Sequence, residues 1–152
     1  MPQVGIIVGS ATDQPVMEDT LKTLTDLGVE AELIVASAHR NPKKVQEYVE
    51  NAPSTGVEVF VAAAGGAAAL PGVVASHTTL PVIGVPIASS ELGGVDALYS
   101  IVQMPPGIPV ATVAVGAWGA RNAALLAAEV LGIKYANIRD AVEQYRERLR
   151  QR

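Results

Sequence analysis

The chain has 152 residues and a formal net charge of −4, so it is long enough to bury one full core and lacks the basic surplus of a general nucleic-acid binder. It contains no cysteine, which excludes disulfides, thiolate catalysis and cysteine-type zinc sites. Apolar residues make up 49% of it and aromatic residues only 4%, and the mean hydropathy is +0.30, so small side chains must form the core. The surplus of alanine and valine over charged residues, which make up 17% of the chain, favours surface buried between subunits.

The N-terminal residues lead directly into a predicted strand, without the basic and apolar regions of a signal peptide. No apolar run reaches the roughly 18 residues that a membrane-spanning helix requires. We therefore expect a cytoplasmic protein that has neither a membrane nor a nucleic acid as its partner.

Residues 4–28 form the first predicted strand–loop–helix unit. Val4–Val8 is a continuous apolar run, typical of a strand buried on both faces, and the helix that begins at Gln14 ends at Gly28. Free N–H groups at such a turn suit a phosphate, although the loop has neither the glycine pattern of dinucleotide binders nor the lysine of a P-loop. Its polar side chains serve either as ligands of a phosphate or as plain helix caps. They are Ser10, Thr12 and Asp13.

The second unit carries the residues that suggest chemistry. Residues 31–36 form a predicted strand, and Asn41 followed by Pro42 predicts the cap and first turn of a helix that ends near Asn51. Histidine moves protons near neutral pH and arginine holds phosphate through two parallel donors, so the intervening loop suggests acid–base chemistry on a phosphorylated substrate. The same loop is also compatible with a solvated surface or a cap. Its polar residues are Ser37, His39 and Arg40.

The third predicted strand covers residues 57–63 and leads into a loop, 64–72, that consists largely of glycine and alanine. Such a loop permits either close helix packing or the approach of the backbone to a ligand. A short helix over residues 73–76 follows.

The same alternation continues to residue 131. His77 precedes a strand, which places it at the amino edge of the sheet and away from the edge where ligands bind, so we expect a structural or surface role. The remaining elements are strands at 80–85 and 110–115, helices at 95–102 and 118–131, a loop at 86–94 and a proline-rich connection at 103–109.

Five strand–helix repeats predict an α/β fold, a three-layer α/β/α sandwich with a five-stranded, mostly parallel sheet. The flavodoxin-like strand order 2-1-3-4-5 is the default for such a sheet. After Lys134 the character changes to an amphipathic helix. We expect residues 1–133 to form the catalytic unit and residues 134–152 to be an appended helix of the same domain, which packs either on its own subunit or on a neighbour.

Several motifs occur in a fixed order along the chain, within residues 4–131. The most specific are Ser-Ala-His-Arg from Ser37 and Ser-Ile-Val-Gln-Met-Pro from Ser100, and they accompany residues 9–13, 64–68 and 80–86. Together these motifs resemble the bacterial PurE family, the 5-(carboxyamino)imidazole ribonucleotide mutases of purine biosynthesis. The resemblance implies an isomerase that moves a carboxylate from the exocyclic nitrogen of its substrate to ring carbon 4.

The resemblance also implies the partners and the site. The ligands would be the phosphorylated aminoimidazole ribonucleotide and CO2, with no metal and no organic cofactor, and the assembly would be a homo-octamer in which residues 103–105 complete a neighbour's site. His39 would be the general acid and base for the carbon-4 proton. The phosphate would bind Arg40, Ser37 and Thr12, the ribose or nearby polar groups would bind Ser10 and Asp13, and the backbone of Gly65, Gly66, Ala67 and Ala68 would line the pocket for CO2 and the carboxylate.

Two positions depart from the family pattern. Thr12 stands where the family commonly has serine, and its hydroxyl can still donate a hydrogen bond. Ala69 stands where the family has a histidine of the site, so a donor near the migrating carboxylate is missing. If His39 alone handles the proton, activity survives with altered binding; if both imidazoles are needed, activity is weakened.

Two alternatives to the mutase follow from these residues. One is direct carboxylation of aminoimidazole ribonucleotide by CO2, and the other is a non-catalytic oligomer that binds the ribonucleotide. A receiver-type signalling domain shares the fold class but needs acidic residues after the first strand and an aspartate after the third. Gly9 and Ala64 occupy those places, which excludes this class.

Overall fold

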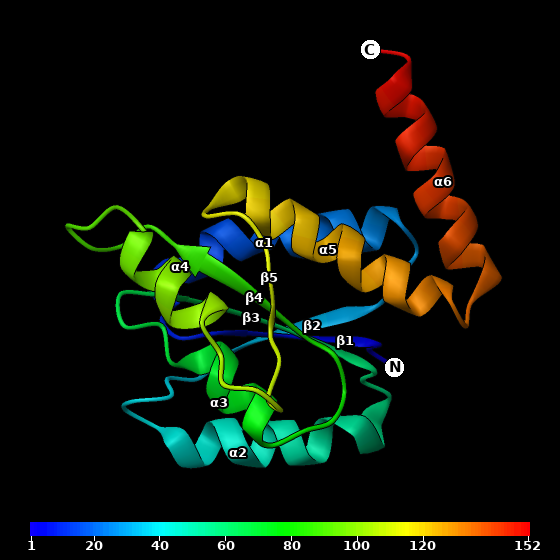
Figure 1. Cartoon of the computed structure of the whole chain (residues 1–152). Helices are drawn as coiled ribbons and strands as arrows, with labels where there is room; N and C mark the ends of the chain where they lie inside the picture. The colour runs from blue at the N-terminus through cyan, green and yellow to red at the C-terminus, as the bar shows by residue number, and fades with distance from the viewer.

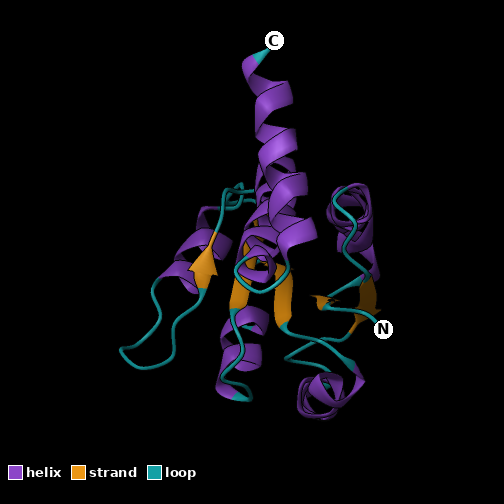
Figure 2. Ribbon diagram, turned by 90° about the vertical axis from the view of Figure 1, so that its right-hand side faces the viewer, coloured by secondary structure: helices purple, strands orange, loops and turns teal.

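The computed structural model describes residues 1–152 and contains a five-stranded parallel sheet between two layers of helices (Figures 1 and 2). The strand order β2-β1-β3-β4-β5 confirms the predicted order, and every strand pair is parallel. The carboxyl ends of all strands therefore meet at one edge of the sheet. The strands are β1 (Val4–Val8), β2 (Ala31–Val35), β3 (Val59–Gly65), β4 (Val82–Ile87) and β5 (Ala111–Thr112).

Two helices cover one face of the sheet and three cover the other (Figure 1). The first layer consists of α1 (Gln14–Asp26) and α5 (Ala117–Gly132), and the second of α2 (Pro42–Asn51), α3 (Leu70–Ser76) and α4 (Val95–Val102). Alternate residues of each strand supply the two cores, so Ile6 of β1 faces the first layer and Ile7 faces the second. Single 3-10 turns follow β1 and α2, at Ala11–Asp13 and Ala52–Thr55.

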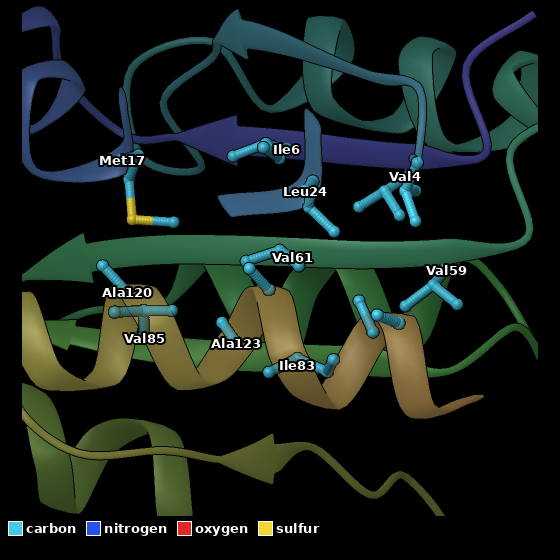
Figure 3. Close-up of a cluster of buried hydrophobic side chains, with 14 of the residues drawn as sticks. Val4, Ile6, Met17, Leu24, Val59, Val61, Ile83, Val85, Ala120 and Ala123 are labelled. Atoms are coloured by element: carbon cyan, nitrogen blue, oxygen red, sulfur yellow. The ribbon is translucent and has the colours of Figure 1, made fainter. Parts of the chain in front are cut away.

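The core between the sheet and the first layer contains the small side chains that the composition predicted. Figure 3 shows Met17 and Leu24 of α1 directed at strand residues such as Val61, with Ala120 of α5 beside them. Because alanine side chains are short, α5 packs closely on both α1 and the sheet. Its buried alanines are Ala120, Ala123, Ala124, Ala127 and Ala128.

Most predicted boundaries agree with the structure to within two residues, and two do not. The predicted six-residue strand at 110–115 was too long, because β5 pairs with β4 over only Ala111 and Thr112. The segment after it turns toward α5, where a Cβ at Gly119 would overlap the Ala114 carbonyl. Helix α3 begins at Leu70, three residues ahead of the predicted start, with a proline in its first turn.

The last helix, α6 (Ala136–Arg150), stands away from the sandwich and carries the C-terminus outward (Figures 1 and 2). Its base packs on its own chain, because Ile138 and Val142 are buried in the core shared with α5, whereas Leu149 near the tip is 43% exposed. Glu58, just before β3, holds the connection to this helix by accepting hydrogen bonds from Tyr135 and Lys134. None of the helices combines the length and the apolar character that a membrane crossing needs.

Candidate active site

A cleft of about 460 Å³ lies at the carboxyl edge of the sheet, where the loops after β1, β2, β3 and β4 meet. This is the edge at which open parallel sheets bind ligands. Eight of the ten predicted site residues line the cleft, and Gly66 and Ala67 do not. The lining consists of Gly9, Ser10, Thr12, Asp13, Ser37, Ala38, His39, Arg40, Ala64, Gly65, Ala68, Ala69, Leu70 and Ser89.

The loop after β1 presents two hydroxyls and one carboxyl group. The Ser10 hydroxyl lies 2.9 Å from the Thr12 hydroxyl and accepts a 3.3 Å hydrogen bond from the Thr12 amide, so it caps the short 3-10 turn. Asp13 precedes α1, but its side chain makes no capping bond. Its burial raises the pKa of the Asp13 carboxyl above the ordinary value. Ser10 is therefore a helix cap, as the capping alternative predicts, whereas the Asp13 side chain does not cap α1.

The loop after β2 carries the cation of the cleft. The Ser37 hydroxyl accepts hydrogen bonds from the backbone N–H of Arg40 at 3.1 Å and from its Nε at 3.4 Å. The Arg40 Nη2 donates to the Gly9 carbonyl at 3.3 Å, which ties this loop to the one after β1. These contacts orient the guanidinium beside the hydroxyls of the first loop, where a phosphate would meet donors from both.

The helix that follows this loop begins as predicted. The Asn41 side chain caps α2 by accepting a 3.2 Å hydrogen bond from the Lys44 amide, and Pro42 occupies the first turn. The cap holds the short segment between β2 and α2 that carries His39. The His39 ring makes no hydrogen bond with the rest of the chain and lines the cleft, so it is available to a ligand.

The loop after β3 forms an apolar wall. Ala68 donates its backbone N–H to the Gly65 carbonyl at 3.1 Å and has a positive φ of 29°, alone among the non-glycine residues. The turn from Gly65 to Ala68 passes through Gly66, which has a φ of 60°, and Ala67. This turn brings Gly65, Ala68 and Ala69 to the cleft, and none of the three carries a polar side chain.

Ser89 also lines the cleft, and the sequence interpretation missed it. It lies two residues after the end of β4, in the segment that the sequence predicts as a plain loop. The available signal was its position, because a polar residue just beyond a parallel strand lies at the ligand-binding edge.

Two other segments lie outside the cleft of this chain. His77 ends α3 at the opposite edge of the sheet, and its Nδ1 lies 4.0 Å from Glu50 Oε1, which agrees with the surface role expected for it. Residues 103–105 follow α4 and do not line the cleft, and Met104 packs instead beside Gly72 of α3.

Comparisons with known proteins match this chain over nearly its whole length. The family model described as AIR carboxylase matches residues 3–152, so the match includes the C-terminal helix as well as the motifs within residues 4–131. An N5-carboxyaminoimidazole ribonucleotide mutase of Pyrococcus abyssi is 57% identical over 147 residues, which cover 97% of this chain and 83% of the relative. That of Thermotoga maritima is 54% identical over 150 residues, covering 99% and 86%.

Solved structures give the same result for the fold. A crystal structure of Treponema denticola PurE superposes with a TM-score of 0.90 at 30% identity and covers 99% of this chain and 93% of that one. The similarity extends over the whole sandwich and supports the flavodoxin-like interpretation.

Proposed function

The chain belongs to the AIR carboxylase family, and on this premise we propose that it is an N5-carboxyaminoimidazole ribonucleotide mutase of purine biosynthesis. The enzyme is an isomerase, which moves the carboxylate of its substrate from the exocyclic nitrogen to ring carbon 4. One observation carries the proposal for the site: a single cleft contains an imidazole, a guanidinium, four hydroxyls and a small apolar wall contributed by four different loops.

The phosphate of the ribonucleotide binds Arg40, Ser37 and Thr12 in this proposal. Support comes from the contact between the Arg40 guanidinium and the Gly9 carbonyl, which brings the loops after β1 and β2 together. An anion between these loops meets a charged donor and hydroxyl donors. Ser10 and Asp13 then hold the ribose, since the Asp13 carboxyl has no partner within the chain and accepts hydrogen bonds from sugar hydroxyls.

His39 is the proposed general acid and base. Cleavage of the bond between the exocyclic nitrogen and the carboxylate carbon releases CO2, and the nitrogen gains one proton. Carbon 4 then attacks CO2, the new C–C bond forms, and His39 takes the carbon-4 proton so that the ring regains its aromatic character. One proton is consumed and one is released, so the isomerisation balances. This role of His39 is supported because its side chain lines the cleft and is the only imidazole there.

The apolar wall retains CO2 between these two steps. CO2 is small and weakly polar, so a dry surface without competing polar side chains holds it beside the ring. Gly65, Ala68 and Ala69 form that surface, and the turn through Gly66 and Ala67 sets the position of the first two.

The assembly in this proposal is a homo-octamer, in which residues 103–105 of one subunit complete the site of a neighbour. Helix α4 supports assembly because its exposed face is apolar. This face consists of Val95, Tyr99 and Val102, which are between 48% and 66% exposed, whereas Ala97 and Ile101 on the opposite face are buried. Leu92, which is 66% exposed, lies in the turn before the helix.

Direct carboxylation of aminoimidazole ribonucleotide by CO2 is the second candidate. The description of the family as AIR carboxylase favours it, and Ala69 leaves the apolar wall without a side-chain donor for the migrating carboxylate.

Turnover of both substrates distinguishes the candidates. Freshly prepared N5-carboxyaminoimidazole ribonucleotide is followed by the ultraviolet absorbance of the carbon-4 carboxylated product, with aminoimidazole ribonucleotide plus bicarbonate as the parallel reaction. Conversion of the first substrate at low bicarbonate supports the mutase. Conversion of only the second assigns a carboxylase, and binding of the product without either reaction indicates a non-catalytic homologue.

A further inference from the structure

The polar side chains of the cleft are unevenly distributed. The loops after β1 and β2 supply Ser10, Thr12, Asp13 and the Ser37–Arg40 segment, whereas the loop after β3 supplies only apolar residues. If the phosphate of a ribonucleotide lies at the first two loops, the part of the base farthest from the phosphate lies near the loops after β3 and β4. Any side-chain hydrogen bond to that part of the base must therefore come from these two loops. Ser89 is the one polar side chain that reaches the cleft from the β3–β4 side.

The Ser89 hydroxyl lies directly over Gly65. A Cβ added to Gly65 would overlap the Ser89 Oγ and would lie 3.0 Å from the Ser89 Cβ, so only glycine leaves room for this serine. The backbone is held as well, because the Ser89 amide donates to the Ile87 carbonyl at 3.1 Å, immediately after β4 ends. The hydroxyl itself has no hydrogen-bond partner in the chain, whereas the neighbouring Ser90 hydroxyl donates to Asp96 Oδ2 at 2.5 Å.

We propose that Ser89 binds the carboxylate of the ribonucleotide and thereby distinguishes carboxylated from uncarboxylated ligands, an inference that rests on the proposed function. The cleft has no other side-chain donor on this side, and a hydroxyl can donate to a carboxylate without bringing in a second charge. Gly65 provides the space in which the hydroxyl and the carboxylate meet beside the CO2-retaining wall.

The test is calorimetric binding of two ligands to the Ser89→Ala variant. The first ligand is the carbon-4 carboxylated product, and the second is aminoimidazole ribonucleotide, which lacks the carboxylate. We expect the affinity for the carboxylated ligand to fall about tenfold or more, the usual loss for a hydrogen bond to a charged group, and the affinity for the uncarboxylated ligand to change less than about twofold. Ser89→Thr, which keeps the hydroxyl, should retain discrimination.

Ser90→Ala is the matched control, because it removes the same hydroxyl from a neighbour that does not line the cleft and should leave both affinities unchanged. Equal losses for the two ligands, or no loss for either, would overturn the proposal. If the wild type binds and converts its substrate but Ser89→Ala still discriminates fully between the two ligands, the role of Ser89 is refuted and the proposed function is not. A wild-type protein that binds neither ligand refutes the proposed function and this inference with it.

Discussion

His39 presents to the cleft the only imidazole there, and no group of the chain forms a hydrogen bond with its ring. If it moves the carbon-4 proton, His39→Gln should lower kcat by about 10²- to 10⁴-fold, the usual contribution of a general acid or base. Product binding, measured by calorimetry, should change only a few-fold because the phosphate contacts remain. His77→Gln alters the only other histidine, at the opposite edge of the sheet, and should leave turnover within about twofold. Comparable kcat values for wild type and His39→Gln would refute the assignment.

Ala69 is the second residue whose replacement is informative, since it lines the cleft at the start of α3. We expect Ala69→His to add a donor beside the migrating carboxylate and to raise kcat/KM for the mutase reaction about tenfold, as a hydrogen bond to a charged group would. Ala69→Leu fills the same space without a donor and serves as the control. An increase in both variants, or in neither, would show that the missing donor does not limit the reaction.

At the scale of elements, one buried hydroxyl joins two helices that are distant in sequence. Thr20 of α1 is fully buried and donates to the Ala120 carbonyl of α5 at 2.7 Å. Thr20→Val keeps the shape but removes the donor, so it should lower the free energy of unfolding by about 1 to 2 kcal/mol in urea titrations. Thr25→Val removes an exposed hydroxyl bond within α1 and should cost less than about 0.5 kcal/mol. Equal costs for the two variants would contradict the role of the α1–α5 bond.

The attachment of α6 should depend on pH. Hydrogen bonds from Tyr135 and then Lys134 hold the pKa of Glu58 below its ordinary value. A carboxyl whose pKa is lowered by folding stabilises the protein above the unfolded-state pKa and loses this effect as the pH falls through the folded-state pKa. The difference in unfolding free energy between wild type and Glu58→Gln should therefore be largest near pH 7 and shrink as the solution is acidified from about pH 5 to pH 3.

Circular dichroism during urea unfolding at fixed protein concentration measures this difference. Glu30→Gln removes a carboxylate that is paired only with the exposed N-terminal amine, so it serves as the control for general acid effects. A difference for Glu58→Gln that stayed constant across this range would refute the pH-dependent attachment.

At the scale of the whole molecule, the apolar face of α4 predicts self-association. Tyr99 is 66% exposed at the middle of this face, so Tyr99→Glu should place an unpaired charge in an interface and shift the protein to smaller species in sedimentation velocity. Turnover should fall with the shift, because residues 103–105 are proposed to complete a neighbour's site. Ser100→Glu adds the same charge to an exposed position off this face and should leave the assembly intact. A monomeric wild type would overturn the proposed octamer.

The local sequence was sufficient for most elements of the fold. Continuous apolar runs predicted β1 and β2, and the pair Asn41–Pro42 predicted the start of α2, because these signals act over a few neighbouring residues. The shortness of β5 was not predictable in this way. It depends on α5, which packs against the segment after Thr112.

For the site, the sequence alone determined which residue types follow each strand, and the parallel alternation already implied that these loops meet at one edge. It thereby predicted His39, Arg40 and the hydroxyls of the first loop. Only the tertiary structure decided that Ser89 occupies the space left by Gly65, that Gly66 and Ala67 turn away from the cleft, and that the base of α6 packs on its own chain. These outcomes depend on close contacts between segments far apart in the chain, which no local pattern records.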